Sequence, residues 1–161
     1  MDIDRLNQWL NLTASVGVMI GLIFLVIEIN QSNRIASYSA EHSRRNQFIE
    51  LNTVRIENSE VHAKLQAGQT DLSASEQTQA LMMARQMINT WKDAEAAYDH
   101  GLLSDETFDT ALKDISVTME EVPGLIPYFG YLVDAYKLEE ESSLISQHVA
   151  EGVTKFKKSS D

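Results

Sequence analysis

Hydrophobic and polar positions are distributed unevenly along the chain, and the longest apolar stretch lies near the N-terminus. Between Leu10 and Ile27 the sequence is LNLTASVGVMIGLIFLVI, which contains no charged residue, and Glu28 follows it. A helix of this length spans roughly 27 Å, close to the hydrocarbon thickness of a bilayer. Trp9 stands where membrane helices often carry an interfacial aromatic side chain. The pattern predicts a single-pass transmembrane helix, with residues 1–29 as an anchor in the lipid bilayer.

A cleaved signal peptide is the main alternative for this stretch. Signal peptides begin with a basic segment and end at a pattern of small residues around the cleavage site. The first residues here, Asp2 to Arg5, carry no basic excess, and the nearest such pattern, Ser37 to Ser39, lies well beyond the apolar stretch. We therefore expect the anchor to be retained.

The helical pattern continues through residues 30–58. Neither glycine nor proline occurs from Ile29 to Ile56, so we expect the membrane helix to run on into the aqueous phase as one long juxtamembrane helix. Apolar residues are sparse between positions 39 and 47. We expect that part to be solvated or to pair with another chain.

Residues 59–161 carry repeated signals for the beginnings and ends of helices. Ser59, Ser73 and Ser104 are candidate N-caps, and Ser73 is followed three residues later by Glu76, the spacing of a capping box. Glycines that would end helices stand at positions 68 and 101, and the pair Pro123-Gly124 interrupts the pattern again. These signals divide the segment into several helices.

Apolar residues in this segment recur at spacings of three and four, the period of an amphipathic helix, as at Leu81, Ala84, Ile88, Trp91 and Tyr98. The last helix is expected over about residues 139–156. The predicted fold class is all-α: the long N-terminal helix is followed by an acidic bundle of four to six helices in residues 59–161.

Three small residues mark one face of the predicted membrane helix. Thr13, Gly17 and Gly21 are spaced by four, and the two glycines form a GxxxG pattern, which lets membrane helices approach closely. Glycine is also simply common in membrane helices. We expect the chain to self-associate through this face as a homo-oligomer.

Basic residues flanking the apolar stretch indicate its orientation. Arg5 precedes the stretch, whereas Arg34, Arg44 and Arg45 follow it. Lysine and arginine are enriched on the cytoplasmic side of membrane helices. We therefore expect the C-terminal domain to be cytoplasmic.

Glu28 lies at the predicted cytoplasmic end of the membrane helix, close to Asn30 and Gln31. In an oligomer it would form a ring of carboxylates that favours cations in a pore. Alternatively it marks where the hydrocarbon ends, and we favour this second interpretation.

The net charge of −11 argues against a nucleic-acid partner, because an acidic domain repels phosphate. There is no cysteine, which excludes disulfides and thiolate metal sites. A basic protein partner is compatible with this charge, although solubility alone explains it. The identity of any protein partner stays open.

Catalytic and cofactor motifs do not stand out in the sequence. It contains no P-loop, no Gly-x-Ser-x-Gly and no Glu-x-x-His, and the histidines fall on different predicted segments, at positions 42, 62, 100 and 148. We assign no catalytic, cofactor-binding or metal-binding residues. The sequence thus offers no positive argument for an enzyme.

Glu95 falls on the apolar stripe between Trp91 and Tyr98 and is a candidate buried charge. A structural ion pair would explain such a position, and three arginines are available as partners, at positions 44, 45 and 85. A boundary position at the edge of the stripe would explain it equally.

The order of motifs resembles a known group of proteins. The anchor ends in Glu28-Ile29-Asn30-Gln31; Asn58-Ser59-Glu60, a helix with Trp91, Asp93 and Tyr98, and the sequence GLLSDE from residue 101 follow. This order is similar to that of a widespread group of uncharacterised bacterial proteins with one N-terminal membrane helix and a small helical domain. The resemblance implies that fold and a location in the bacterial inner (plasma) membrane, and it implies no activity.

Three functions are compatible with these features. We expect a membrane-anchored, non-enzymatic helical protein for interaction or scaffolding. The alternatives are an oligomeric assembly that conducts ions or perturbs the membrane, with Asn11, Thr13 and Ser15 along its path, and an enzyme of unknown chemistry near Glu95.

Overall fold

The computed structural model describes residues 3–159, and these residues are all-helical. They form six α helices and two short 3-10 helices, with no strand among them. In chain order the elements are α1 (Ile3–Glu57), α2 (Ser59–Gln66), α3 (Ala74–Asp99), α4 (Asp105–Glu121), η1 (Pro123–Leu125), α5 (Ile126–Tyr136), η2 (Leu138–Glu140) and α6 (Leu144–Ser159). The structure confirms the predicted all-α fold with one long apolar N-terminal helix. The ends of the predicted anchor and bundle, residues 1–2 and 160–161, lie outside the described residues.

The chain divides into two compact units, and the division falls within α1. The first unit ends at Ser39 and consists of α1 alone in its described part. The second begins at Ala40 and contains the last turns of α1 and all the later helices. The boundary therefore falls inside the segment 30–58.

Local capping signals set most helix ends in the second unit. The Ser73 side chain accepts a hydrogen bond from the Glu76 backbone N–H, and the Glu76 carboxylate accepts one from Ser73 N, which confirms the capping box. The Ser104 side chain caps α4 by accepting a hydrogen bond from the Thr107 backbone N–H. Gly68 and Gly101 have φ of 69° and 68°, conformations in which a side chain is strained. These positions end α2 and α3 as the sequence predicts.

One predicted cap and one predicted helix start are wrong. Ser59 does not cap α2: the residue before the helix is Asn58, whose side chain instead donates to the Val54 carbonyl. The last helix begins at Leu144 rather than near residue 139, because residues 138–140 form the separate 3-10 helix η2. Ser143 precedes α6, and its Oγ accepts a hydrogen bond from Ser146 N at 3.0 Å.

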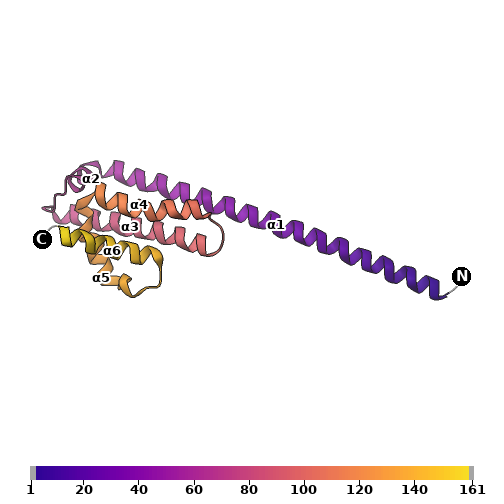
Figure 1. Ribbon diagram of the computed structural model, residues 1–161. Coiled ribbons are helices and arrows are strands. Elements are labelled where there is room, and N and C mark those ends of the chain that lie inside the picture. The colour runs from indigo at the N-terminus through magenta and orange to yellow at the C-terminus, as the bar shows by residue number, and fades with distance from the viewer. Residues whose placement is uncertain (1–2, 160–161) are drawn as a thin grey trace. The chain divides into compact units, whose positions relative to one another are not determined.

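The core of the second unit is organised around α3, which packs against α2, α4, α5 and α6 (Figure 1). Trp91 is buried at its centre, 5.8 Å from the Phe129 ring between centroids. Its indole Nε1 donates to Asp114 Oδ2 at 2.8 Å, so the one polar atom of this large side chain has a partner. Burial of these aromatic side chains contributes to the stability of the unit.

A close backbone approach joins α2 to η1. Gly124 is buried, and a Cβ added there would lie 2.7 Å from the carbonyl oxygen of Leu65. Leu65 is itself fully buried. Only glycine leaves room for the two backbones at this point.

Within the second unit, α1 residues 40–57 pack against the later helices through one face. Leu51 is the one buried residue among positions 40–57, and half-buried positions continue this face at Gln47 and Val54. Gln47 Nε2 donates to Asp93 Oδ2 at 2.9 Å. Burial lowers the pKa of Arg44, while the charge of Asp114 acts in the opposite direction. Most residues between positions 39 and 47 are exposed, as expected for a solvated stretch, whereas Ala40, Arg44 and Gln47 are half-buried.

Candidate functional site

The apolar part of α1 is the most unusual surface of the molecule. All side chains from Leu10 to Ile27 are exposed, with large apolar examples from 49% for Val16 to 66% for Phe24. A helix of a water-soluble protein buries an apolar stripe, whereas this segment is apolar on every side. Among residues 3–159, α1 is the one helix long and apolar enough to cross a bilayer.

Polar side chains at the start of this segment are satisfied within the helix. The Thr13 hydroxyl donates to the Trp9 carbonyl at 2.8 Å, and the Ser15 hydroxyl donates to the Asn11 carbonyl at 2.9 Å. The helical backbone bonds are likewise internal to the segment. The free-energy cost of transferring such a segment from water into a bilayer is therefore low.

The small residues Thr13, Gly17 and Gly21 lie on one face of this segment. A Cβ added at Gly17 or Gly21 would meet no atom within 4 Å. The packing of a single chain therefore does not require glycine at either position. Since glycine within a helix costs about 1 kcal/mol relative to alanine, these two residues leave an open surface without benefit to the isolated chain.

Glu28 follows the apolar segment directly and is exposed. Beyond it, Asn30, Gln31 and Arg34 border a shallow hollow along α1 that ends at Tyr38. The transition from apolar to polar side chains therefore occurs within two turns of helix.

Glu95 is half-buried near the end of α3 and contacts the start of α6. Its carboxylate accepts hydrogen bonds from the Ser143 hydroxyl and from the Leu144 backbone N–H, each at 2.5 Å. These partners differ from the three arginines that the sequence offered. A carboxylate at the positive end of a helix dipole is stabilising, so Glu95 contributes to capping α6.

A second set of polar contacts lies beside this cap. Lys92 Nζ is 2.6 Å from Glu141 Oε2, and the Ser146 hydroxyl donates to the same oxygen at 2.6 Å. These hydrogen bonds, from Lys92 first and then Ser146, lower the pKa of Glu141. This set was not predicted from the sequence, because Lys92 and Glu141 are 49 positions apart. The only sign of it in the sequence is that Lys92 and Glu95 are spaced by three and so share a face of α3.

The histidines and the end of α3 do not form a metal centre in the described residues. Across residues 3–159, no group of three His, Asp or Glu side chains is close enough to hold a metal ion. Asp99 is the last residue of α3, and the backbone N–H of His100 bonds to the Ala96 carbonyl. These two residues therefore belong to the helix end.

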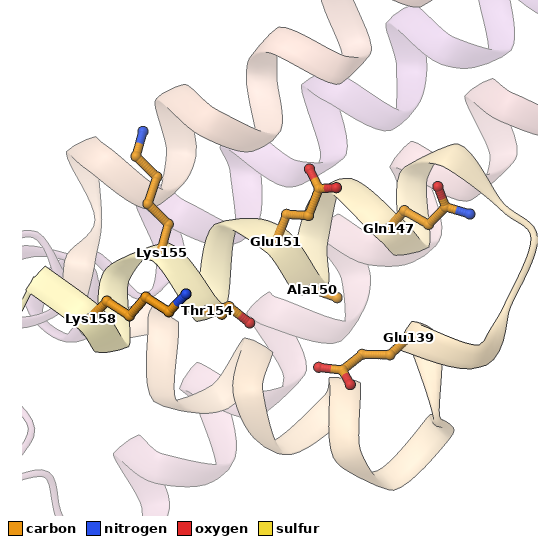
Figure 2. Close-up of a pocket in the computed structure, with 7 residues that line it drawn as sticks. All are labelled: Glu139, Gln147, Ala150, Glu151, Thr154, Lys155 and Lys158. Carbon is orange, nitrogen blue, oxygen red and sulfur yellow. The ribbon is translucent and has the colours of Figure 1, made fainter.

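A hollow of about 520 Å³ lies between α6 and η2 (Figure 2). Glu139 of η2 borders it on one side, and residues of α6 from Gln147 to Lys158 border it on the other. Figure 2 shows the Glu151 and Lys155 side chains extending away from Glu139. The charged groups do not converge on one point, which a site for a small polar ligand requires.

Comparisons of the chain with protein-family models, with curated proteins and with solved structures find no match.

Proposed function

We propose that the chain is a single-pass membrane protein in which α1 anchors an acidic helical interaction domain at the cytoplasmic face of a bacterial inner membrane. The observation that supports the anchor best is the exposure of every side chain from Leu10 to Ile27. Leaving this surface in water costs about 25 cal/mol per Å² of apolar area, and a bilayer removes that cost. The arginines that follow the segment support the cytoplasmic orientation.

Membrane fractionation with an alkaline wash tests the anchor. The full chain is expected in the membrane pellet. The double variant Leu22→Arg/Leu25→Arg is expected in the soluble fraction, because each arginine at the middle of a membrane helix costs about 2.5–3.5 kcal/mol. The matched control Ile49→Arg/Ile56→Arg changes exposed residues outside the segment and is expected to stay in the pellet. Release of the unmodified chain by the wash would refute the anchor.

We further propose that the chain self-associates through the face with Thr13, Gly17 and Gly21, so that the domain is presented in several copies as a scaffold. Support comes from the open surface at both glycines, which a second copy of the helix fits. Close approach of two membrane helices over small residues gains dispersion contacts that the single helix lacks.

Exposed isoleucines beyond the anchor support the same arrangement. In the first unit Gly21, Glu28 and Ile35 are spaced by seven, as are Ile49 and Ile56 in the second. A spacing of seven keeps side chains on the common face of paired helices. Ile49 and Ile56 are 56% and 75% exposed, and pairing of two chains would cover them.

Cross-linking in native membranes tests self-association. The variant Gly17→Leu/Gly21→Leu fills the open face and is expected to reduce the cross-linked dimer severalfold. Ser15→Leu is the matched control, because it adds bulk to the opposite face of the same helix. Equal cross-linking in the chain and in both variants would refute this interface while leaving the anchor intact.

A further inference from the structure

A small cavity lies between α3 and the segment from α5 to η2. Its volume is about 240 Å³. One wall is the face of α3 that carries Arg85, Ile88, Asn89 and Lys92. The opposite wall includes Leu132, Tyr136 and Leu138, and Glu141 stands at its edge. The α3 wall is thus mostly polar, with Ile88 as its apolar member, and the opposite wall is largely apolar; both lie within the second unit.

The charges around this cavity do not cancel. Lys92 is paired with Glu141 at 2.6 Å. The other ion pairs found among residues 3–159 are Lys64–Glu76 and Lys137–Glu140. Arg85 takes part in none of them, so its positive charge is uncompensated in a chain whose net charge is −11.

The guanidinium of Arg85 is also incompletely satisfied. Its Nε is buried and has no hydrogen-bond partner among the described residues. Its terminal carbon lies 5.8 Å from the centre of the Tyr136 ring, which positions the guanidinium over an aromatic face. Buried donors in folded proteins normally have partners. The remaining N–H groups of the guanidinium match a carboxylate with two parallel hydrogen bonds.

We propose that this cavity binds a small organic monocarboxylate. Its carboxylate pairs with Arg85, the Asn89 amide supplies a further donor, and its apolar part lies against Leu132, Tyr136 and Leu138. The single uncompensated cation matches one negative charge. A dianion such as phosphate carries a second negative charge, which the Glu141 carboxylate would repel.

The size of the cavity restricts the ligand further. Pockets for drug-sized ligands measure about 300–1,000 Å³, so a volume of about 240 Å³ suits a smaller molecule. A short aliphatic acid or a single aromatic ring with a carboxylate fits this description. The two walls match the two ends of such a molecule, because the charged end contacts α3 and the apolar end contacts α5 and η2.

Titration of the full-length chain in lipid nanodiscs with benzoate tests the proposal. The readout is the chemical shift of the Leu132 and Leu138 methyl groups, which face the expected apolar part of the ligand. Saturable shifts are expected with benzoate. Benzylamine, which has the same ring and the opposite charge, and inorganic phosphate, which has no apolar part, are expected to produce no saturable shift.

Variants at Arg85 separate specific binding from general effects. Arg85→Met keeps much of the side-chain volume and is expected to weaken benzoate binding about tenfold or more. Arg45→Met, the matched control on the exposed face of α1, is expected to bind as the unmodified chain does. Arg85→Lys keeps the charge without the planar fork and is expected to bind with intermediate affinity, which also provides a folded variant if Arg85→Met does not fold.

Three results would overturn the proposal: no saturable shift with benzoate, equal affinity in Arg85→Met, or equal binding of benzylamine or phosphate. The cavity lies within the second unit, so these results are independent of membrane insertion and self-association. Failure here therefore leaves the anchor and the dimer face untouched, and failure of those leaves this site untouched.

Discussion

The Glu95 carboxylate of α3 accepts a hydrogen bond from the hydroxyl of Ser143, which lies 48 positions later in the sequence, directly before α6. Ser143 in turn accepts from the backbone N–H of Ser146 in the first turn of α6. One carboxylate and one hydroxyl therefore satisfy backbone and side-chain donors at the start of the last helix. The contact therefore lies at the position where α6 begins.

Glu95→Gln is expected to lower the free energy of unfolding by about 1–2 kcal/mol, because a charged acceptor at a helix N-terminus is replaced by a neutral one. Denaturation of the full chain in detergent, followed by Trp91 fluorescence in a Trp9→Phe background, measures the change. Glu120→Gln alters an exposed glutamate of α4 and is the matched control, expected within about 0.5 kcal/mol of the unmodified chain. Equal stability of Glu95→Gln and Glu120→Gln would show that the cap is dispensable.

Glu76 is expected to make stability depend on acid pH. Hydrogen bonds from the Lys64 ammonium and from Ser73 lower the pKa of Glu76 from 4.5 to about 2. The folded-state pKa lies below the unfolded value, so the contribution is fully present above pH 4.5 and is lost as the pH falls toward 2. Between these limits, the stability of Glu76→Gln is expected to fall less steeply than that of the unmodified chain.

Denaturant midpoints at several acid pH values measure this slope. Glu120→Gln serves again as the control and is expected to keep the slope of the unmodified chain. If the stability of Glu76→Gln changed with pH as steeply as that of the unmodified chain and of Glu120→Gln, the lowered pKa of Glu76 would be contradicted.

Gly124→Ala is expected to destabilise the second unit by about 1–3 kcal/mol. The added Cβ would meet the backbone of Leu65 at 2.7–2.8 Å, and neither backbone can move as a side-chain end can. Gly130→Ala, in α5, is the matched control, because its nearest contact is the Val153 side chain at 3.4 Å. Thermal unfolding is expected to show a lower Tm for Gly124→Ala and an unchanged or higher Tm for Gly130→Ala.

Local signals predicted much of the fold. Ser73 with Glu76 and the glycines at 68 and 101 act within one turn of helix, so their effect is visible in a short stretch of sequence. The continuation of α1 beyond the apolar segment followed from the absence of glycine and proline between Ile29 and Ile56. The apolar surface of residues 10–27 could also be predicted from a short stretch, because it depends only on the composition of that stretch.

Contacts between distant positions could not be predicted in the same way. The first residue of α6 donates its N–H to Glu95 in another helix, and Gln47 donates to Asp93, 46 positions away. The cavity near Arg85 draws its walls from three segments. Periodicity identifies faces of helices, and it does not specify which faces meet.

Labelling of single cysteines tests the central claim most directly, because the chain contains no cysteine of its own. Asn7→Cys, Met19→Cys and Ser43→Cys place one thiol before, within and after the apolar segment. A membrane-impermeant maleimide is added to intact spheroplasts, and again after disruption. For an anchor with a cytoplasmic domain, the expected result is labelling at position 7 in intact spheroplasts, labelling at position 43 only after disruption, and labelling at position 19 only after denaturation. Labelling of all three positions under the same conditions would contradict a membrane-spanning α1.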